Sequence, residues 1–212
     1  MSDRFLITGA GDAPCTILLA HGAGGAMDSG SMTAASTALA SAGFRVVRFE
    51  FSYMAARRLE GSRKPPPRAE TLIPEYRAAV AELGGTGPLV IGGKSMGGRV
   101  ASMLADELHG AGKIRGLLCL GYPFHPPGKP ESLRTAHLEN LETPALIVQG
   151  TRDEFGTRDE VASYSLSQKI RLLWLEDGDH DLKPRKKISG FSASDHLATM
   201  ADCVKSWATE LP

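Results

Sequence analysis

Ser95 stands where an apolar run ends abruptly between glycines. Residues 93–97 read Gly-Lys-Ser-Met-Gly and follow residues 89–91, Leu-Val-Ile, which are typical of a short buried strand. The pattern G-x-S-x-G predicts a sharp turn from strand to helix that lifts one hydroxyl clear of a sheet. Glycine suits both flanking positions because such a strained turn leaves no room for side chains there. Ser95 is therefore the candidate nucleophile.

The residues after Ser95 favour the helix that this turn requires. Apolar residues recur on one helical face, at Val100, Ala101, Leu104, Ala105 and Leu108. Residues 93–95 also resemble the end of a phosphate-binding loop. That motif needs a glycine five residues before Gly93, where this chain has Pro88. The sequence thus argues against a nucleotide site.

A serine hydroxyl becomes a strong nucleophile when a base takes its proton and an acid orients that base. With this kind of turn the chain order is serine, acid, histidine, and the last two lie on loops after later strands. Asp153 follows the apolar run 145–150, and His180 follows the run 172–175. We expect Asp153 to be the orienting acid and His180 the base.

Alternatives to this assignment stay open. Asp153 could be a surface or helix-start carboxylate, with Glu154 or Asp159 in its place. His180 could be a solvated loop residue. The other histidines in the second half of the chain fit the base less well, because they end or start helices, lie among prolines or precede the acid: His109, His125, His137 and His196.

A second glycine-rich segment, His21-Gly22-Ala23-Gly24-Gly25, follows the strand signal at 16–20. It matches the HGGG-type loop, in which small residues let backbone N–H groups approach a substrate oxygen. We expect the amide of Met96 to be one oxyanion donor and that of Ala23 the other, with Gly24 the next choice. The alternative is a plain glycine-rich turn with a structural histidine.

Strand and helix signals alternate along the whole chain, which predicts a parallel sheet covered by helices on both faces. We expect an α/β fold with a mostly parallel sheet of about six to seven strands and no cap domain, forming one domain over residues 1–212. Residues 52–68 read as a polar, basic, proline-bearing loop. The expected strands are 16–20, 44–51, 89–91, 116–121, 144–150 and 171–175, and the expected helices are 31–42, 69–83, 160–167, 193–210 and one after Ser95.

The bulk composition excludes several classes of function. Lys plus Arg equals Asp plus Glu at 24 each, so no overall field favours nucleic acid or an anionic membrane. The start of the chain lacks a signal-peptide core, and no apolar run is long enough to span a membrane. Three scattered cysteines, Cys15, Cys119 and Cys203, predict reduced thiols. We expect a cytoplasmic protein without metal or cofactor, of undetermined oligomeric state.

Taken in order, the motifs HGAGG, GKSMGG and GTRDEFG with DGDHDL resemble the α/β-hydrolase superfamily over roughly residues 15–210. HGAGG with GKSMGGR is similar to a compact, lid-free branch of small predicted hydrolases. This branch is dienelactone-hydrolase-like and is also seen in a testis-expressed protein and a chromatin-complex subunit. The resemblance implies Ser95 as nucleophile, Asp153 as acid and His180 as base. Dienelactone hydrolases use cysteine at the nucleophile position, so their substrate is not carried over.

These observations predict a serine hydrolase that cleaves a carboxylic ester, thioester or related acyl bond through an acyl-serine intermediate. A non-catalytic interaction scaffold on the same fold is the main alternative. An acyltransferase or peptidase with the same three residues would differ only in acceptor or leaving group.

Two basic stretches, 57–68 and 183–187, suggest an anionic small-molecule acyl substrate if they flank the pocket mouth. The alternative is that both are solvated loops balanced by the acids Glu176, Asp177, Asp179 and Asp181. The residues that we expect to line the substrate pocket are His21, Lys94, Arg57 and Arg58.

Overall fold

The computed structural model of the protein describes residues 4–61, 65–85 and 87–212. Seven strands in these ranges form one sheet, in the order β1-β3-β2-β4-β5-β6-β7. All neighbours are parallel except β1, which runs antiparallel to β3. The strands are β1 (Phe5–Thr8), β2 (Thr16–Ala20), β3 (Arg45–Phe49), β4 (Leu89–Lys94), β5 (Gly116–Leu120), β6 (Ala145–Gly150) and β7 (Ile170–Leu175).

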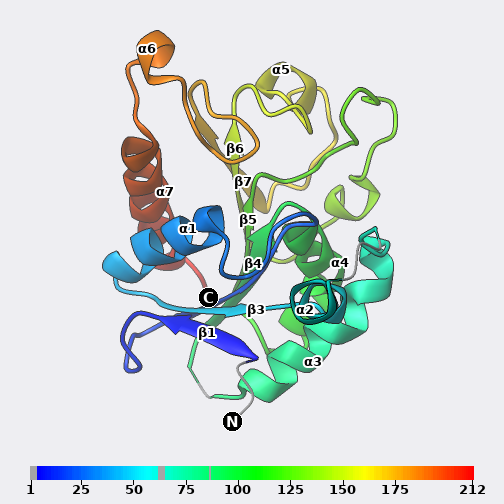
Figure 1. Ribbon diagram of the computed structural model, residues 1–212, viewed down its shortest axis with the longest axis vertical. Helices are drawn as coiled ribbons and strands as arrows, with labels where there is room; N and C mark the ends of the chain where they lie inside the picture. Colours follow the sequence, from blue (N-terminus) through cyan, green and yellow to red (C-terminus); the bar gives the residue numbers. More distant parts are fainter. Residues whose placement is uncertain (1–3, 62–64, 86) are drawn as a thin grey trace.

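Helices cover both faces of the sheet, as predicted. Figure 1 shows α1 and α7 on one side and α2, α3 and α4 on the other. The helices are α1 (Gly30–Ser41), α2 (Ser52–Glu60), α3 (Ile73–Leu83), α4 (Met96–Gly110), α5 (Arg158–Val161), α6 (Lys186–Ser189) and α7 (Ala193–Ala208), with short 3-10 turns η1 (Ala69–Leu72) and η2 (Ala136–Leu138).

Each face of the sheet has its own apolar core. The predicted face of α4 is buried, with Val100 and Leu104 packed on the same side as Tyr76 of α3. On the other side, Met200 and Val204 of α7 pack with residues of α1. Two-sided burial explains why the central strands read as continuous apolar runs.

Strand β1 and helix α2 are two of the elements that the sequence did not predict. Strand β1 was not expected, because its four residues pair at an edge and are mostly half-buried. Residues 52–60 form helix α2, so the prediction of a loop over 52–68 was wrong there. These nine residues lack glycine and proline, and the left-handed Gly61, at φ 66°, ends the helix. The carboxylate of Glu75 accepts hydrogen bonds from the amide and hydroxyl of Ser52 at the helix start.

Other boundaries moved for local reasons. The predicted helix 69–83 is divided into η1 and α3. Pro74 has no backbone N–H to donate inside a continuous helix, so it lies in the first turn of α3, where no such hydrogen bond is needed. Helix α5 begins earlier than predicted, at a capping box formed by Thr157 and Glu160. It is also shorter than the predicted 160–167.

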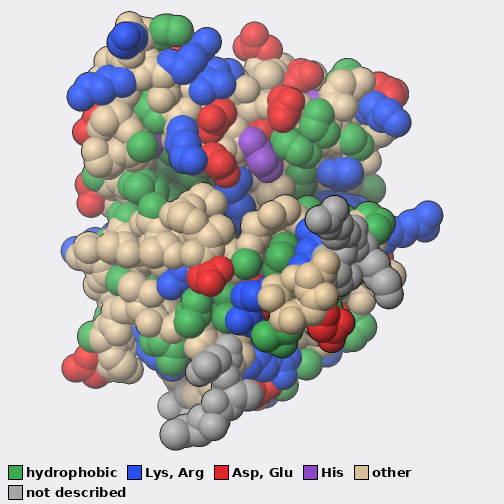
Figure 2. Space-filling view, viewed as in Figure 1, with side chains coloured by type: hydrophobic (Ala, Val, Ile, Leu, Met, Phe, Trp, Pro, Cys, Tyr) green, Lys and Arg blue, Asp and Glu red, His purple; other side chains and the backbone are tan. Residues whose placement is uncertain are grey.

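The described helices do not combine the length and apolar character that a membrane crossing needs. All three cysteines are free, with Cys119 buried and Cys15 and Cys203 half-buried. Figure 2 shows acidic and basic side chains interspersed over the visible face, in keeping with the balanced charge.

The parallel strands bring their carboxyl ends to one edge of the sheet. Chain segments leaving β2, β4, β6 and β7 therefore start side by side, although they are far apart in sequence. His21, Ser95, Asp153 and His180 lie on these four segments.

Candidate active site

Ser95 occupies the strained turn that its flanking glycines predicted. Its backbone lies in the left-handed region at φ 51°, ψ −118°, which is rare for a residue with a side chain. A Cβ at Gly93 would lie 2.5 Å from the carbonyl oxygen of Ala20, and a Cβ at Gly97 would meet the same oxygen. The close approach of β2 thus requires glycine at both positions.

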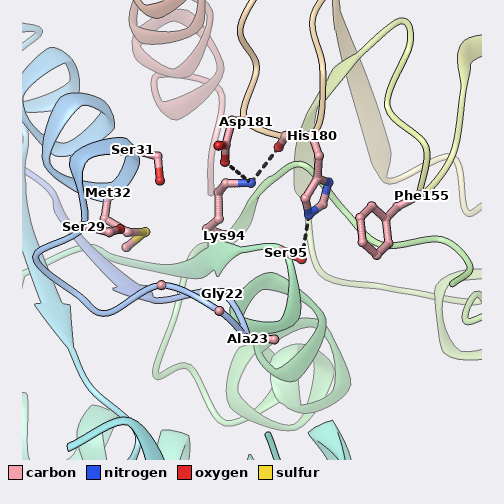
Figure 3. A pocket seen from close by; sticks show the side chains of 12 residues that line it. Gly22, Ala23, Ser29, Ser31, Met32, Lys94, Ser95, Phe155, His180 and Asp181 are labelled. Carbon is pink, nitrogen blue, oxygen red and sulfur yellow. Dashed lines mark hydrogen bonds and ion pairs between the residues drawn. The ribbon is translucent and has the colours of Figure 1, made fainter. Parts of the chain in front are cut away.

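Ser95, His180 and Asp153 form a continuous hydrogen-bonded chain. His180 Nε2 lies 2.8 Å from Ser95 Oγ (Figure 3), and His180 Nδ1 lies 2.8 Å from Asp153 Oδ2. Because an ionised carboxylate only accepts hydrogen bonds, Nδ1 carries the imidazole proton and Nε2 is left to accept from the serine. Glu154 and Asp159, the alternative acids, are exposed.

Asp153 is fully buried and held by partners besides His180. Its Oδ1 accepts from the amide of Phe155, and its Oδ2 accepts from Gln149 Nε2 at 2.9 Å. The side-chain oxygen of Gln149 in turn accepts from the amide of Tyr122 at 2.7 Å. Gln149 therefore joins the loop after β5 to the acid. Sequence reasoning missed this residue, although a glutamine at the end of an otherwise apolar strand was a usable signal.

Phe155 is a second residue that sequence reasoning missed. Its ring stacks on the imidazole of His180, with centroids 4.1 Å apart and planes inclined by 30°. The contact covers one face of the imidazole and limits its rotation. An isolated phenylalanine in a polar loop carried no sequence signal for this role.

Lys94, which we expected to line the substrate pocket, borders a hollow beside Ser95 and also holds the loop that carries His180. Its side chain is only 10% exposed, and its Nζ donates to the carbonyl oxygen of His180 at 2.6 Å. Nζ also lies 3.2 Å from Asp181 Oδ1 (Figure 3). Burial raises the pKa of Asp181, but the charge and hydrogen bond of Lys94 outweigh this and keep the pKa below its usual value.

His21, which we expected to line the substrate pocket, is absent from the described lining of both hollows that border Ser95. Its side chain is fully buried; Nδ1 bonds the carbonyl oxygen of Gly22 at 2.7 Å, and Nε2 accepts from the amide of Phe51 at 3.1 Å. Burial lowers the pKa of His21, in agreement with a neutral ring that donates at Nδ1 and accepts at Nε2. His21 therefore ties the glycine-rich loop to the segment after β3.

Tyr53 of α2, another residue missed from sequence, holds the same loop. Its hydroxyl lies 3.1 Å from the carbonyl oxygen of Ala23 and 3.4 Å from that of Gly22. Burial raises the pKa of Tyr53 to about 12, so the hydroxyl keeps its proton and donates. In a trans peptide the N–H points opposite to the C=O. The amides of Ala23 and Gly24 therefore point away from Tyr53.

The two arginines predicted to line the pocket have other partners. Arg57 lies over the Tyr53 ring and donates to the carbonyl oxygen of Ala23 at 3.4 Å. Arg58 forms an ion pair with Glu50 at 3.0 Å. Residues 62–64 of the first basic stretch lie outside the described residues.

The second basic stretch, 183–187, is absent from the described lining of both hollows beside Ser95. Arg185 is paired with Asp177, and Lys183 lies 3.6 Å from Asp181. Figure 2 shows Lys and Arg side chains gathered at the end of the molecule where Figure 1 places α6. These observations favour a solvated, internally paired segment.

Two hollows meet at Ser95 and share Ala23 and Phe155 in their walls. The first, of about 380 Å³, is lined by the glycine-rich loop, Lys94 and His180 (Figure 3). The second, of about 330 Å³, lies beside Met96 at the start of α4. Within the described ranges, no cluster of three or more His, Cys, Asp or Glu residues could hold a metal ion.

The sheet is mostly parallel and seven-stranded, with Ser95 on a strained turn after β4 and a histidine and an acid on later loops. This arrangement defines the α/β-hydrolase fold class. Comparison with known families agrees, because residues 13–209 match the alpha/beta hydrolase domain. The chain belongs to this family. Membership supports hydrolase activity in general.

Solved structures with the same fold cover nearly the whole chain. A lid-free α/β serine hydrolase from Xanthomonas campestris has 21% identity and a TM-score of 0.71, covering 98% of this chain and 89% of its own. Dienelactone hydrolase from Anabaena variabilis has 17% identity and a TM-score of 0.69, with 98% and 91% covered. The esterase domain of a Rhodothermus marinus protein has 18% identity and a TM-score of 0.67, with 97% and 91% covered.

Proposed function

We propose that the protein is a serine hydrolase that cleaves a carboxylic ester, thioester or related acyl bond through an acyl-serine intermediate. The observation that carries the proposal is the hydrogen-bonded chain from Asp153 through His180 to Ser95, with 2.8 Å at both links. This is the arrangement that activates a serine hydroxyl: His180 takes its proton while Asp153 holds the tautomer and stabilises the imidazolium.

In the first half-reaction Ser95 Oγ attacks the substrate carbonyl and His180 Nε2 accepts the hydroxyl proton. The same proton then passes to the leaving alcohol or thiol as the acyl-serine forms. In the second half-reaction His180 takes a proton from water, the hydroxide attacks the acyl group, and Ser95 is regenerated. The products are the free acid and the alcohol or thiol.

The negative charge on the attacked oxygen needs backbone donors, for which we assign the amides of Met96 and Ala23. The Met96 amide begins α4, where a helix leaves its first N–H groups without internal partners. Ala23 borders both hollows together with Ser95, and its N–H points away from Tyr53. Gly24 borders only the first hollow in the described lining, which makes it the second choice.

Hydrolysis of a short p-nitrophenyl ester tests the proposal, with Ser95→Ala as the decisive variant. We expect turnover to be abolished while the unfolding transition is retained. Ser102→Ala is the matched control, because Ser102 Oγ also lies 2.8 Å from a histidine, Nε2 of His137, but its side chain is buried. This variant should retain activity. Undiminished turnover by Ser95→Ala would refute the assignment, and an inert wild type would favour an interaction scaffold.

A further inference from the structure

The second hollow beside Ser95 is lined by an excess of positive charge. Three arginines border it, from three separate parts of the chain: Arg68 before η1, Arg99 in α4 and Arg134 in the segment before η2. Glu70 is the carboxylate that accompanies them. Only Arg68 belongs to a basic stretch that the sequence singled out, so the folded chain assembles this cluster from isolated residues.

The guanidinium groups in this hollow are incompletely paired. Arg99 donates through one terminal nitrogen to Glu70 at 2.6 Å, but its Nε is buried without an acceptor. Among the described residues, the guanidinium groups of Arg68 and Arg134 have no hydrogen-bond or ion-pair partner. Burial, together with the charge of Arg99, lowers the pKa of Arg134. A planar group with several free donors is suited to a carboxylate, which it binds through two parallel hydrogen bonds.

The position of His180 distinguishes the two hollows. In the reaction proposed above, the leaving group must receive a proton from His180, which lines the first hollow and not the second. The leaving group therefore belongs in the first hollow. The part of the substrate that stays on Ser95 as the acyl-enzyme extends into the second, toward the arginines.

We propose that the second hollow is an anion subsite for the acyl part of the substrate, in which Arg99 and Arg134 bind a terminal carboxylate and Arg68 lies at the rim. The substrate is then a half-ester or half-thioester of a short dicarboxylic acid. Hydrolysis consumes one water and releases the alcohol or thiol together with the dicarboxylate. This reaction rests on the proposed function, whereas binding of the dicarboxylate product does not.

The kinetic test compares two esters of equal acyl length, mono-4-nitrophenyl adipate and 4-nitrophenyl hexanoate. We expect the wild type to prefer the adipate ester through a lower KM. The ratio of kcat/KM values should fall about tenfold in Arg99→Gln and in Arg134→Gln, as for loss of a hydrogen bond to a charged group. The matched control is Arg77→Gln, which removes the exposed ion pair of Arg77 with Glu107. This variant should keep the wild-type ratio.

Two further arms separate charge binding from a structural defect. Glu70→Gln removes the competing carboxylate from Arg99 and should raise the preference for the adipate ester. Arg134→Lys keeps the charge without the planar fork, so its ratio should lie between those of wild type and Arg134→Gln. Raising ionic strength from about 0.05 M to about 0.5 M should narrow the wild-type preference. If the ratio of kcat/KM for the adipate ester to that for the hexanoate ester stayed at its wild-type value in Arg99→Gln and Arg134→Gln, the subsite would be overturned.

The hexanoyl ester of 3-hydroxybenzoate, which carries its carboxylate on the leaving group, tests whether the arginines bind the acyl part or the leaving group. We expect its kcat/KM to be the same in the wild type and in the arginine variants. If the arginines raised kcat/KM for this ester and not for mono-4-nitrophenyl adipate, the assignment of the second hollow to the acyl part would be overturned.

Direct binding separates this inference from the proposed function. Calorimetry should show adipate binding to Ser95→Ala and its loss when Arg99→Gln is added. If no ester is turned over but adipate binding still depends on the arginines, the proposed reaction fails and the anion subsite stands. If esters are hydrolysed without preference and adipate does not bind, the subsite fails and the serine hydrolase stands.

Discussion

The ammonium group of Lys94 donates a hydrogen bond to the backbone carbonyl of His180, with 2.6 Å between the two atoms. The residue before the candidate nucleophile thus fixes the loop that carries the candidate base, across 86 positions of sequence. Asp181 pairs with the same ammonium, so that its positive charge has a counter-ion although the side chain is nearly buried. One lysine therefore joins the two halves of the proposed catalytic apparatus.

Loss of this contact should loosen His180 without removing it. We expect Lys94→Met to lower kcat by roughly tenfold to a hundredfold, because misplacement of a catalytic group by about 1 Å can cost that much. KM should change little. Stopped-flow or steady-state ester hydrolysis measures the effect, with the exposed Lys205→Met as control. An unchanged kcat would mean that the loop is positioned without Lys94.

Asp153→Asn tests whether Asp153 orients His180, because asparagine has nearly the same shape as aspartate but carries no charge. An amide can donate to His180 Nδ1 and so favour the tautomer whose Nε2 cannot accept from Ser95. We expect kcat to fall by about four orders of magnitude, the scale found for this change in a serine protease. Asp159→Asn, which alters an exposed neighbouring carboxylate, should be close to wild type. If Asp159→Asn instead lost most of its kcat while Asp153→Asn stayed close to wild type, the orienting acid would be Asp159.

Gln149→Leu removes a buried amide that serves Asp153 and both backbone groups of Tyr122. Leaving such groups without partners costs about 1–3 kcal/mol each, so we expect the free energy of unfolding to fall by a few kcal/mol. The activity should fall as well, since Asp153 loses a donor. Urea unfolding and ester turnover give the two readings. Gln168→Leu, at an exposed position, should change neither.

The buried His21 should make the free energy of unfolding depend on pH in the acidic range. Burial holds its pKa below the usual 6.5, so the unfolded chain takes up a proton at a higher pH than the folded chain. The free energy of unfolding therefore falls as pH drops below about 6.5 and levels off below the folded pKa. The half-buried His137, whose pKa is also lowered mainly by desolvation, adds to the same trend.

The contribution of His21 is isolated with His21→Gln, which retains hydrogen-bonding groups but does not titrate. We expect this variant to be less stable at pH 7.5 but to lose less stability between pH 7 and pH 5. Urea midpoints across this range provide the measurement. Parallel curves for the two proteins would assign the acid sensitivity to other groups.

Much of the site could be predicted from the sequence because its parts lie next to local signals. Ser95 has its glycines, and Asp153 and His180 each follow an apolar strand. The structure brings these three side chains into one hydrogen-bonded chain. The same glycine signal located the loop at Ala23, but not the buried position of His21. A histidine at a strand end reads alike whether it lines a cleft or supports a loop.

The residues that were missed act through contacts distant in sequence. Tyr53 reaches the loop at Ala23 from α2, and Phe155 covers His180 from another strand end. Arg99 and Arg134 come together only when α4 packs beside the segment before η2. Strand β1 escaped prediction because its apolar run, Phe5-Leu6-Ile7, is only three residues long and, unlike residues 89–91, is followed by no recognisable motif.

Labelling with a fluorophosphonate is the most direct measurement of whether Ser95 is an activated nucleophile. Intact mass should show one covalent adduct on the wild type, and peptide mapping should place it on Ser95 and not on Ser102. His180→Ala should slow labelling by orders of magnitude while leaving the protein folded. An unlabelled wild type, or an adduct on another serine, would contradict the account.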